Sequence, residues 1–240
     1  MQNVTRRQLL RSAVATTAAV SVAGCSGGDG STEDSGDSGS TPAGGSGETA
    51  SGSRPNDSPD PDCSRLAGSP TPYDASGTPF VFEFDYVDSW TLKEPLEGPE
   101  GRVQGLSSPV VSVDGEPENA GLTVQQKFEP VTAAEVDETI ADSTSGSYAR
   151  VEVLDEQSFD GESVRFVGFP DAVLPYYEAW LPYGDGEARY YQLQMQLLTS
   201  ITRLDEDNVA RELCVEETVS GIETVRESLR PNPDSTIEEV

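Results

Sequence analysis

No large apolar side chain appears between Cys25 and Leu66, and this gap limits where the chain can fold. The segment consists mainly of Gly, Ser, Asp, Thr and Pro, which cannot bury enough surface to offset the entropy lost on ordering. We therefore expect residues 25–77 to form a disordered linker and residues 231–240 to form a disordered acidic tail. The stretch between them, 78–230, has about 150 residues, which is enough for one domain with its own core.

The first 24 residues have the layout of an export signal. Three arginines are the only charged side chains before Cys25, and all of them precede the short apolar run Ala13–Ala23. That run is about 11 residues long, whereas a helix needs about 20 to span a bilayer. Residues 1–24 therefore predict a cleaved signal peptide. The alternative is an uncleaved signal anchor followed by an incidental cysteine.

Two short motifs in this leader resemble known sorting signals. The pair Arg6-Arg7, with Leu9 two places on, resembles the twin-arginine export signal, which carries folded proteins. The four residues that end at Cys25, Val-Ala-Gly-Cys, resemble the lipobox of lipoproteins, in which the cysteine receives the lipid and becomes the new N-terminus. The resemblance implies a protein anchored by lipid at Cys25 to the extracytoplasmic face of the cell membrane.

The charge balance is strongly acidic. The chain has 43 acidic and 15 basic residues, a net charge of −28, and no histidine. Such a charge destabilises a compact state by self-repulsion, which salt at about 1 M screens within about 3 Å. An acidic, lysine-poor composition resembles proteins of extremely halophilic archaea. The alternative is an acidic surface for a cationic partner. The absence of a basic patch disfavours nucleic-acid binding.

Apolar residues recur at strand and helix periods between Thr78 and Arg230. Six segments predict strands by alternation or by β-rich composition: Pro79–Val87, Leu122–Phe128, Tyr148–Phe159, Val164–Phe169, Tyr176–Tyr183 and Ala188–Thr199. Two segments predict helices: Thr132–Ala141, which begins with a capping box, and Asn208–Leu229. The order predicts an α+β fold, an antiparallel sheet of about six to seven strands with packed helices.

The start of this domain, FVFEFDYVDSW at Phe80–Trp90, resembles the first strand and turn of PsbP-like domains, where an aromatic strand runs into a YP..W corner. The closing helix, with Ile222 and Val225, is similar to that family's last helix. Val87 stands where the family's corner has proline. The resemblance spans Phe80–Arg230 by order of elements and implies a PsbP-like fold. The family includes photosystem extrinsic proteins and other binding or assembly modules, mostly non-catalytic.

Once Cys25 carries a lipid, two cysteines remain, Cys63 and Cys214. An even pair in an exported domain predicts a disulfide, and the alternative is two separate thiols. Asn56 begins an Asn-Asp-Ser sequon and is a candidate glycosylation site.

Catalysis finds little support in the sequence. Without histidine there is no imidazole base and no histidine-based triad or zinc site. No phosphate-binding glycine loop or nucleophile elbow occurs in the folded part, so we expect no cofactor, no metal and no enzyme.

The best candidate for a binding surface is an aromatic cluster; the alternative is that it packs in the core. Its members are Tyr176, Tyr177, Trp180, Tyr183 and Tyr190. The leading functional prediction is a non-catalytic binding or assembly module whose partner is an unidentified extracytoplasmic protein. Alternatives are a solute-binding lipoprotein that delivers a ligand to a transporter, and a carboxylate-based hydrolase, because two carboxylates suffice for acid and base roles.

Overall fold

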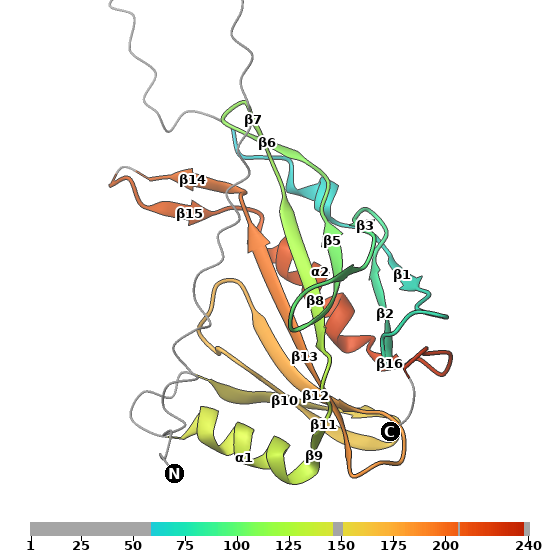
Figure 1. Ribbon diagram of the computed structural model, residues 1–240. Helices are drawn as coiled ribbons and strands as arrows, with labels where there is room; N and C mark the ends of the chain where they lie inside the picture. Colours follow the sequence, from blue (N-terminus) through green and yellow to red (C-terminus); the bar gives the residue numbers. More distant parts are fainter. Residues whose placement is uncertain (1–58, 146–150, 206, 238–240) are drawn as a thin grey trace, which may run out of the picture. The chain divides into compact units, whose positions relative to one another are not determined.

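A nine-stranded antiparallel sheet organises the part of the chain that the computed structural model describes, residues 59–145, 151–205 and 207–237 (Figure 1). The main order of its strands is β10-β11-β12-β13-β8-β5-β3, with β4 also paired to β5 and β9 to β13. The strands are β3 (Thr91–Leu92), β4 (Leu96–Glu97), β5 (Gly101–Ser107), β8 (Ala120–Lys127), β9 (Val131–Thr132), β10 (Glu152–Phe159), β11 (Glu162–Gly168), β12 (Tyr176–Pro182) and β13 (Ala188–Thr199).

Three smaller sheets accompany it. A three-stranded sheet has the order β1-β2-β16, and two hairpins form separate two-stranded sheets, β6-β7 and β14-β15. Their strands are β1 (Pro70–Tyr73), β2 (Phe82–Val87), β16 (Arg230–Pro231), β6 (Val111–Val113), β7 (Glu116–Glu118), β14 (Thr202–Leu204) and β15 (Ala210–Glu212).

The alternating sequence of β13 divides its two faces as predicted. Tyr191, Leu193, Met195 and Leu197 are buried, at 5%, 1%, 0% and 3% exposure, whereas the glutamines between them are half-buried or exposed. The turn that joins β12 to β13 contains Gly184 at φ +75°, a conformation that favours glycine. The predicted hairpin about this turn is therefore confirmed.

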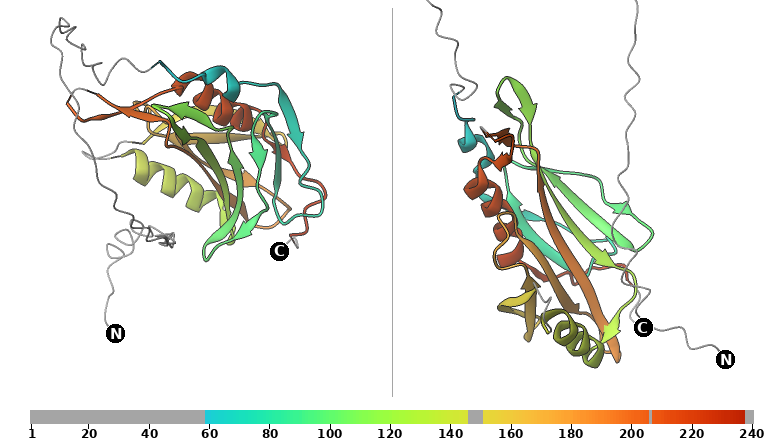
Figure 2. Two further views of the ribbon diagram at one scale, coloured as in Figure 1. Left: turned by 90° about the horizontal axis from the view of Figure 1, so that it is seen from above. Right: turned by 90° about the vertical axis from the view of Figure 1, so that its left-hand side faces the viewer.

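The two α-helices pack on opposite faces of the large sheet (Figure 2). Helix α1 (Ala133–Thr144) begins with the predicted capping box between Thr132 and Glu135, and its Val136 packs with Trp180 of the sheet. Helix α2 (Val215–Glu227) buries its apolar stripe in the main core on the other face, together with β2 and the apolar side of β13.

The predicted fold class, α+β with packed helices on one sheet, was wrong. The described residues form sixteen strands in four sheets and only two α-helices, so the unit is mostly β-sheet. The prediction missed the strands of two to four residues, which are too short to show a period. It also missed the seven-residue β5, GRVQGLS, whose glycines and polar residues obscure its alternation. The second helix also begins later than Asn208, because Ala210–Glu212 pairs with Thr202–Leu204 instead.

Ordered structure extends beyond the predicted boundaries, 78 and 230. A short 3-10 helix, η2 (Cys63–Leu66), and β1 precede Thr78, and Leu66 is fully buried. At the other end Asn232 is also fully buried, and its side-chain amide donates to the carbonyls of Ala75 and Phe80. Residues 59–77 and 231–237 therefore belong to the folded unit, because hydrogen bonds and buried side chains tie both segments to it.

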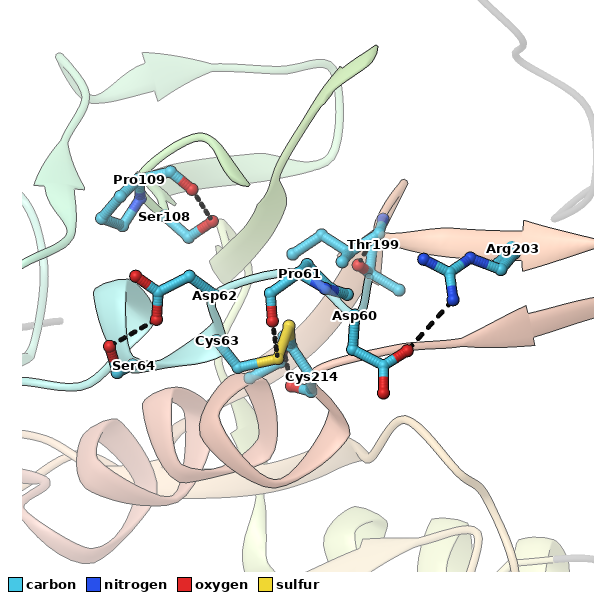
Figure 3. Close-up of a disulfide and its surroundings, with 12 residues drawn as sticks. Asp60, Pro61, Asp62, Cys63, Ser64, Ser108, Pro109, Thr199, Arg203 and Cys214 are labelled. Carbon is cyan, nitrogen blue, oxygen red and sulfur yellow. Dashed lines mark hydrogen bonds and ion pairs between the residues drawn. A yellow bond between two sulfur atoms is a disulfide. The ribbon is translucent and has the colours of Figure 1, made fainter. Parts of the chain in front are cut away.

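The predicted disulfide between Cys63 and Cys214 is confirmed (Figure 3). It joins the start of η2 to the residue that precedes α2, across a sequence separation of 151 residues. In the chain-entropy model, closing so long a loop stabilises the folded state by roughly 5 kcal/mol. The segment that follows the linker is thus held covalently against the last helix.

Trp90 explains a glycine inside α2. The indole is 4% exposed, and its Nε1 donates to the carbonyl of Leu66 at 3.1 Å, so the ring is fixed. A β-carbon placed on Gly221 would lie 2.8 Å from Cζ2 of this ring. The helix therefore approaches Trp90 more closely than any larger residue allows.

We predict that Gly221→Ala destabilises the protein. The better helix propensity of alanine contributes about 1 kcal/mol, but overpacking against a fixed ring costs about 1–3 kcal/mol. The denaturant midpoint at high salt should fall for G221A and should not fall for the exposed neighbouring control, Ser220→Ala. A G221A midpoint at or above the wild-type value would contradict this packing.

Candidate functional site

The face of the large sheet that carries α1 holds the candidate site. Strand register aligns Val167 of β11 with Glu178 of β12 and Gln194 of β13, and continues to Gln125 of β8 and Val103 of β5. Directly opposed residues of an antiparallel pair point to the same side of the sheet. Helix α1 lies over the end of the sheet near β9, β10 and β11 (Figure 1).

Beyond α1, three strands present a surface whose own residues carry no charge, which we call the neutral face. Two charged side chains border it, since Lys93 packs beside Gly105 and Glu178 accepts a hydrogen bond from Gln194. It is a grid of three residues from each strand, aligned in three rows by the register. Its members are Gln194, Gln196 and Leu198 on β13, Gly121, Thr123 and Gln125 on β8, and Val103, Gly105 and Ser107 on β5. Gln196 and Leu198 are exposed and the others are half-buried, so these side chains are open to a partner.

Glu178 lies at the border between the neutral face and α1. Its carboxylate accepts a hydrogen bond from the Tyr176 hydroxyl and bonds from the amides of Gln192 at 3.3 Å and Gln194 at 3.1 Å. Burial, and then the hydrogen bond to Glu178, raises the pKa of the Tyr176 phenol well above its ordinary value. Tyr176 therefore remains a neutral donor that orients the carboxylate.

Beside Glu178 the surface is hollowed into a cleft of about 450 Å³, which we call the α1 cleft. Its walls come from the end of α1, from the region of β10 and β11, and from β12 and β13. The lining residues are Ser143, Val151, Val167, Phe169, Tyr176, Glu178 and Gln196. The rings of Phe169 and Tyr176 lie 6.0 Å apart between centroids. One carboxylate thus faces a cleft with mainly apolar and aromatic walls.

The predicted aromatic surface is not one surface, because successive residues of a strand face opposite sides. Tyr177 is buried in the main core at 8% exposure, and Trp180 is buried under α1 at 5%. Tyr183 and Tyr190 are half-buried near the turn, where Tyr190 donates to Glu162 at 2.9 Å. The alternative, core packing, therefore describes Tyr177 and Trp180, and only Tyr176 lines the α1 cleft.

A larger hollow, about 770 Å³, lies beside the disulfide and the β14–β15 hairpin. Its lining is rich in charged groups. Arg203 contacts Asp60 at 3.0 Å (Figure 3), whereas the other charged lining residues form no ion pair within the described residues; these are Asp205, Asp207, Arg211 and Glu212. The α1 cleft instead combines aromatic and apolar walls with one half-buried carboxylate, which is the more typical lining of a small-molecule site. We therefore favour the cleft, although it is smaller.

Several predicted residues cannot be placed. Arg6, Arg7, Cys25 and Asn56 lie outside the described residues, so the export signal, the lipid anchor and the glycosylation site stay predictions. Within the described ranges no group of three or more acidic or cysteine side chains is arranged to hold a metal ion. No helix in the same ranges is long and apolar enough to cross a membrane.

Comparisons with protein-family models, with curated proteins and with solved structures found no match to this chain. The resemblances to halophilic lipoproteins and to PsbP-like domains therefore stay predictions.

We predict that Tyr176→Phe flattens the alkaline limb of the stability curve. The folded-state pKa of Tyr176 is raised, so above about pH 10 the unfolded chain loses this proton first and the free energy of unfolding falls with pH. Removing the hydroxyl should reduce that slope by up to about 1.4 kcal/mol per pH unit. Denaturant unfolding at high salt, from about pH 9 to about pH 12, measures the slope. An unchanged slope would show that Tyr176 ionises alike in both states.

Proposed function

We propose that this protein is a lipid-anchored lipoprotein of the extracytoplasmic membrane face, and that its β-rich unit is a non-catalytic binding or assembly module. The leader up to Cys25 supports the anchored location. The neutral face supports the binding or assembly role, because it offers a surface that a partner could contact.

The neutral face is unusual for this composition. The chain is 24% charged, but none of the nine grid residues is, and Glu178 and Lys93 bring charge only to its borders. Acidic side chains keep such a protein soluble by repulsion and by hydration. A broad sheet face without them is suited to contact with another macromolecule, where unpaired charges would have to be desolvated.

A protein partner fits this surface better than a nucleic acid does. Depletion of charged residues at the centre is the compositional mark of protein–protein interfaces, whereas nucleic-acid interfaces are basic. Gln194, Gln196 and Gln125 supply amide donors and acceptors, and Leu198, 55% exposed, supplies an apolar contact.

The anchor is tested on the membrane fraction. Mass spectrometry of the native protein should find an N-terminus at Cys25 that carries lipid, and Cys25→Ser should be released from the membrane. An intact Met1 or an unmodified Cys25 on the mature chain would overturn the anchored location.

The contact surface is tested with two matched variants, Leu198→Glu and Leu204→Glu. Both leucines are similarly exposed, at 55% and 59%, but Leu204 lies on the β14–β15 hairpin, away from the neutral face. After crosslinking in native membranes at high salt, we expect L198E to lose its crosslinked partner about tenfold or more, because a buried unpaired charge costs several kcal/mol. L204E should keep it.

Equal loss in both variants, or in neither, would contradict the neutral face as the contact surface. A thermal melt of each variant in the same salt confirms that both remain folded.

A further inference from the structure

We propose that the α1 cleft binds a small organic cation, an ammonium group with apolar substituents. This ligand site adjoins the neutral face and shares Gln196 with it, but the proposal does not depend on whether that face contacts a protein. It rests on three features of the cleft, which are its aromatic pair, its carboxylate and its size.

The aromatic pair supplies a short-range attraction for a cation. Phe169 and Tyr176 both line the cleft, with ring centroids 6.0 Å apart and planes tilted by 44°. A cation within about 6 Å of a ring centroid is attracted by the negative ring face, and aromatic pockets bind quaternary ammonium groups in this way. Phe169 is 40% exposed, so its ring is accessible from solvent.

The carboxylate supplies the charge. Glu178 is half-buried and accepts bonds from one hydroxyl and two amides, all neutral groups, and it forms no ion pair within the described residues. Other carboxylates of the sheet do form ion pairs. Glu162 of β11 pairs with Arg189 of β13, and Asp155 of β10 pairs with Arg226 of α2. A carboxylate that has no ionic partner within the described residues can attract a cation that enters the cleft beside it.

The walls decide what kind of cation fits. Val151 and Val167 give the cleft apolar sides, which favour a weakly hydrated alkylammonium over a metal ion that keeps its water. A volume of about 450 Å³ lies within the range of small-molecule sites, about 300–1,000 Å³. A ligand carboxylate held inside the cleft would be repelled by Glu178, which favours a monocation over a zwitterion.

The proposal is tested with choline chloride and its neutral isostere, 3,3-dimethyl-1-butanol. The two have nearly the same shape, so a difference in binding reports the charge. Ligand-observed saturation-transfer NMR on the folded protein, at about 3 M salt where long-range attraction is screened, measures both dissociation constants. We expect the wild type to bind choline at least about tenfold more tightly than the isostere.

Two variants in the cleft test where choline binds, and a third removes one negative charge at a position outside the cleft as a control. Glu178→Gln keeps the hydrogen-bond acceptor for Tyr176 but removes the charge, and it should abolish the preference for choline. Phe169→Leu removes one ring and should weaken choline binding about threefold to tenfold. Glu187→Gln changes an exposed carboxylate in the β12–β13 turn and should leave binding as in the wild type.

Arg150 immediately precedes Val151 and lies outside the described residues, so the titration is repeated on Arg150→Gln to remove a competing cation of the chain. The site is supported if the wild type binds choline and E178Q does not, or if R150Q binds choline and the double variant R150Q/E178Q does not. Equal binding of choline and the isostere, an effect of E187Q as large as that of E178Q, or no choline binding in either background would overturn it.

Discussion

The register of β13 is the constraint on which the rest of the sheet depends. This strand pairs with β12 on one side and with β8 and β9 on the other, so it fixes the position of both halves. Its apolar residues reach the core on every second position, with Met195 fully buried, and glutamines occupy the positions between. A slip by one residue would exchange these two sets and bury the glutamines, which makes the observed register strongly preferred.

Polar side chains then hold the other elements to this frame. Gln126 is 1% exposed, accepts from the Val81 amide at 2.8 Å and donates to the Pro79 carbonyl, which ties β8 to the segment before β2. Arg226 of α2 contacts Asp155 of β10 and Glu223 of its own helix, and the Tyr177 hydroxyl donates to the same Glu223. Burial, and then that hydrogen bond, raises the pKa of Tyr177, so the phenol stays a donor and the link between α2 and the sheet persists.

The neutral face and the α1 cleft lie on the same face of the large sheet, because α1 covers only part of that face. The main core, with α2 and β2, covers most of one side, whereas α1 covers only part of the other through Val136 and Trp180. Beyond α1 no helix or strand of the described residues packs over the sheet, and there Gln196 on the glutamine side of β13 is exposed. The cleft forms at the border, where the end of α1 stops short of Tyr176 and Glu178.

The sequence by itself determined the local elements that have a clear period: the β12–β13 hairpin, the capped start of α1, the apolar stripe of α2, and the pairing of the two remaining cysteines. It also showed which side of β13 is polar. Only the tertiary structure decided that most of the unit is β-sheet, because short strands are defined by partners distant in the chain and show no pattern alone. The same holds for the site: Glu178 is one of 43 acidic residues, and register with Gln194 and contact with Tyr176 distinguish it. Periodicity predicts which face a residue takes, but proximity across strands is a property of the fold.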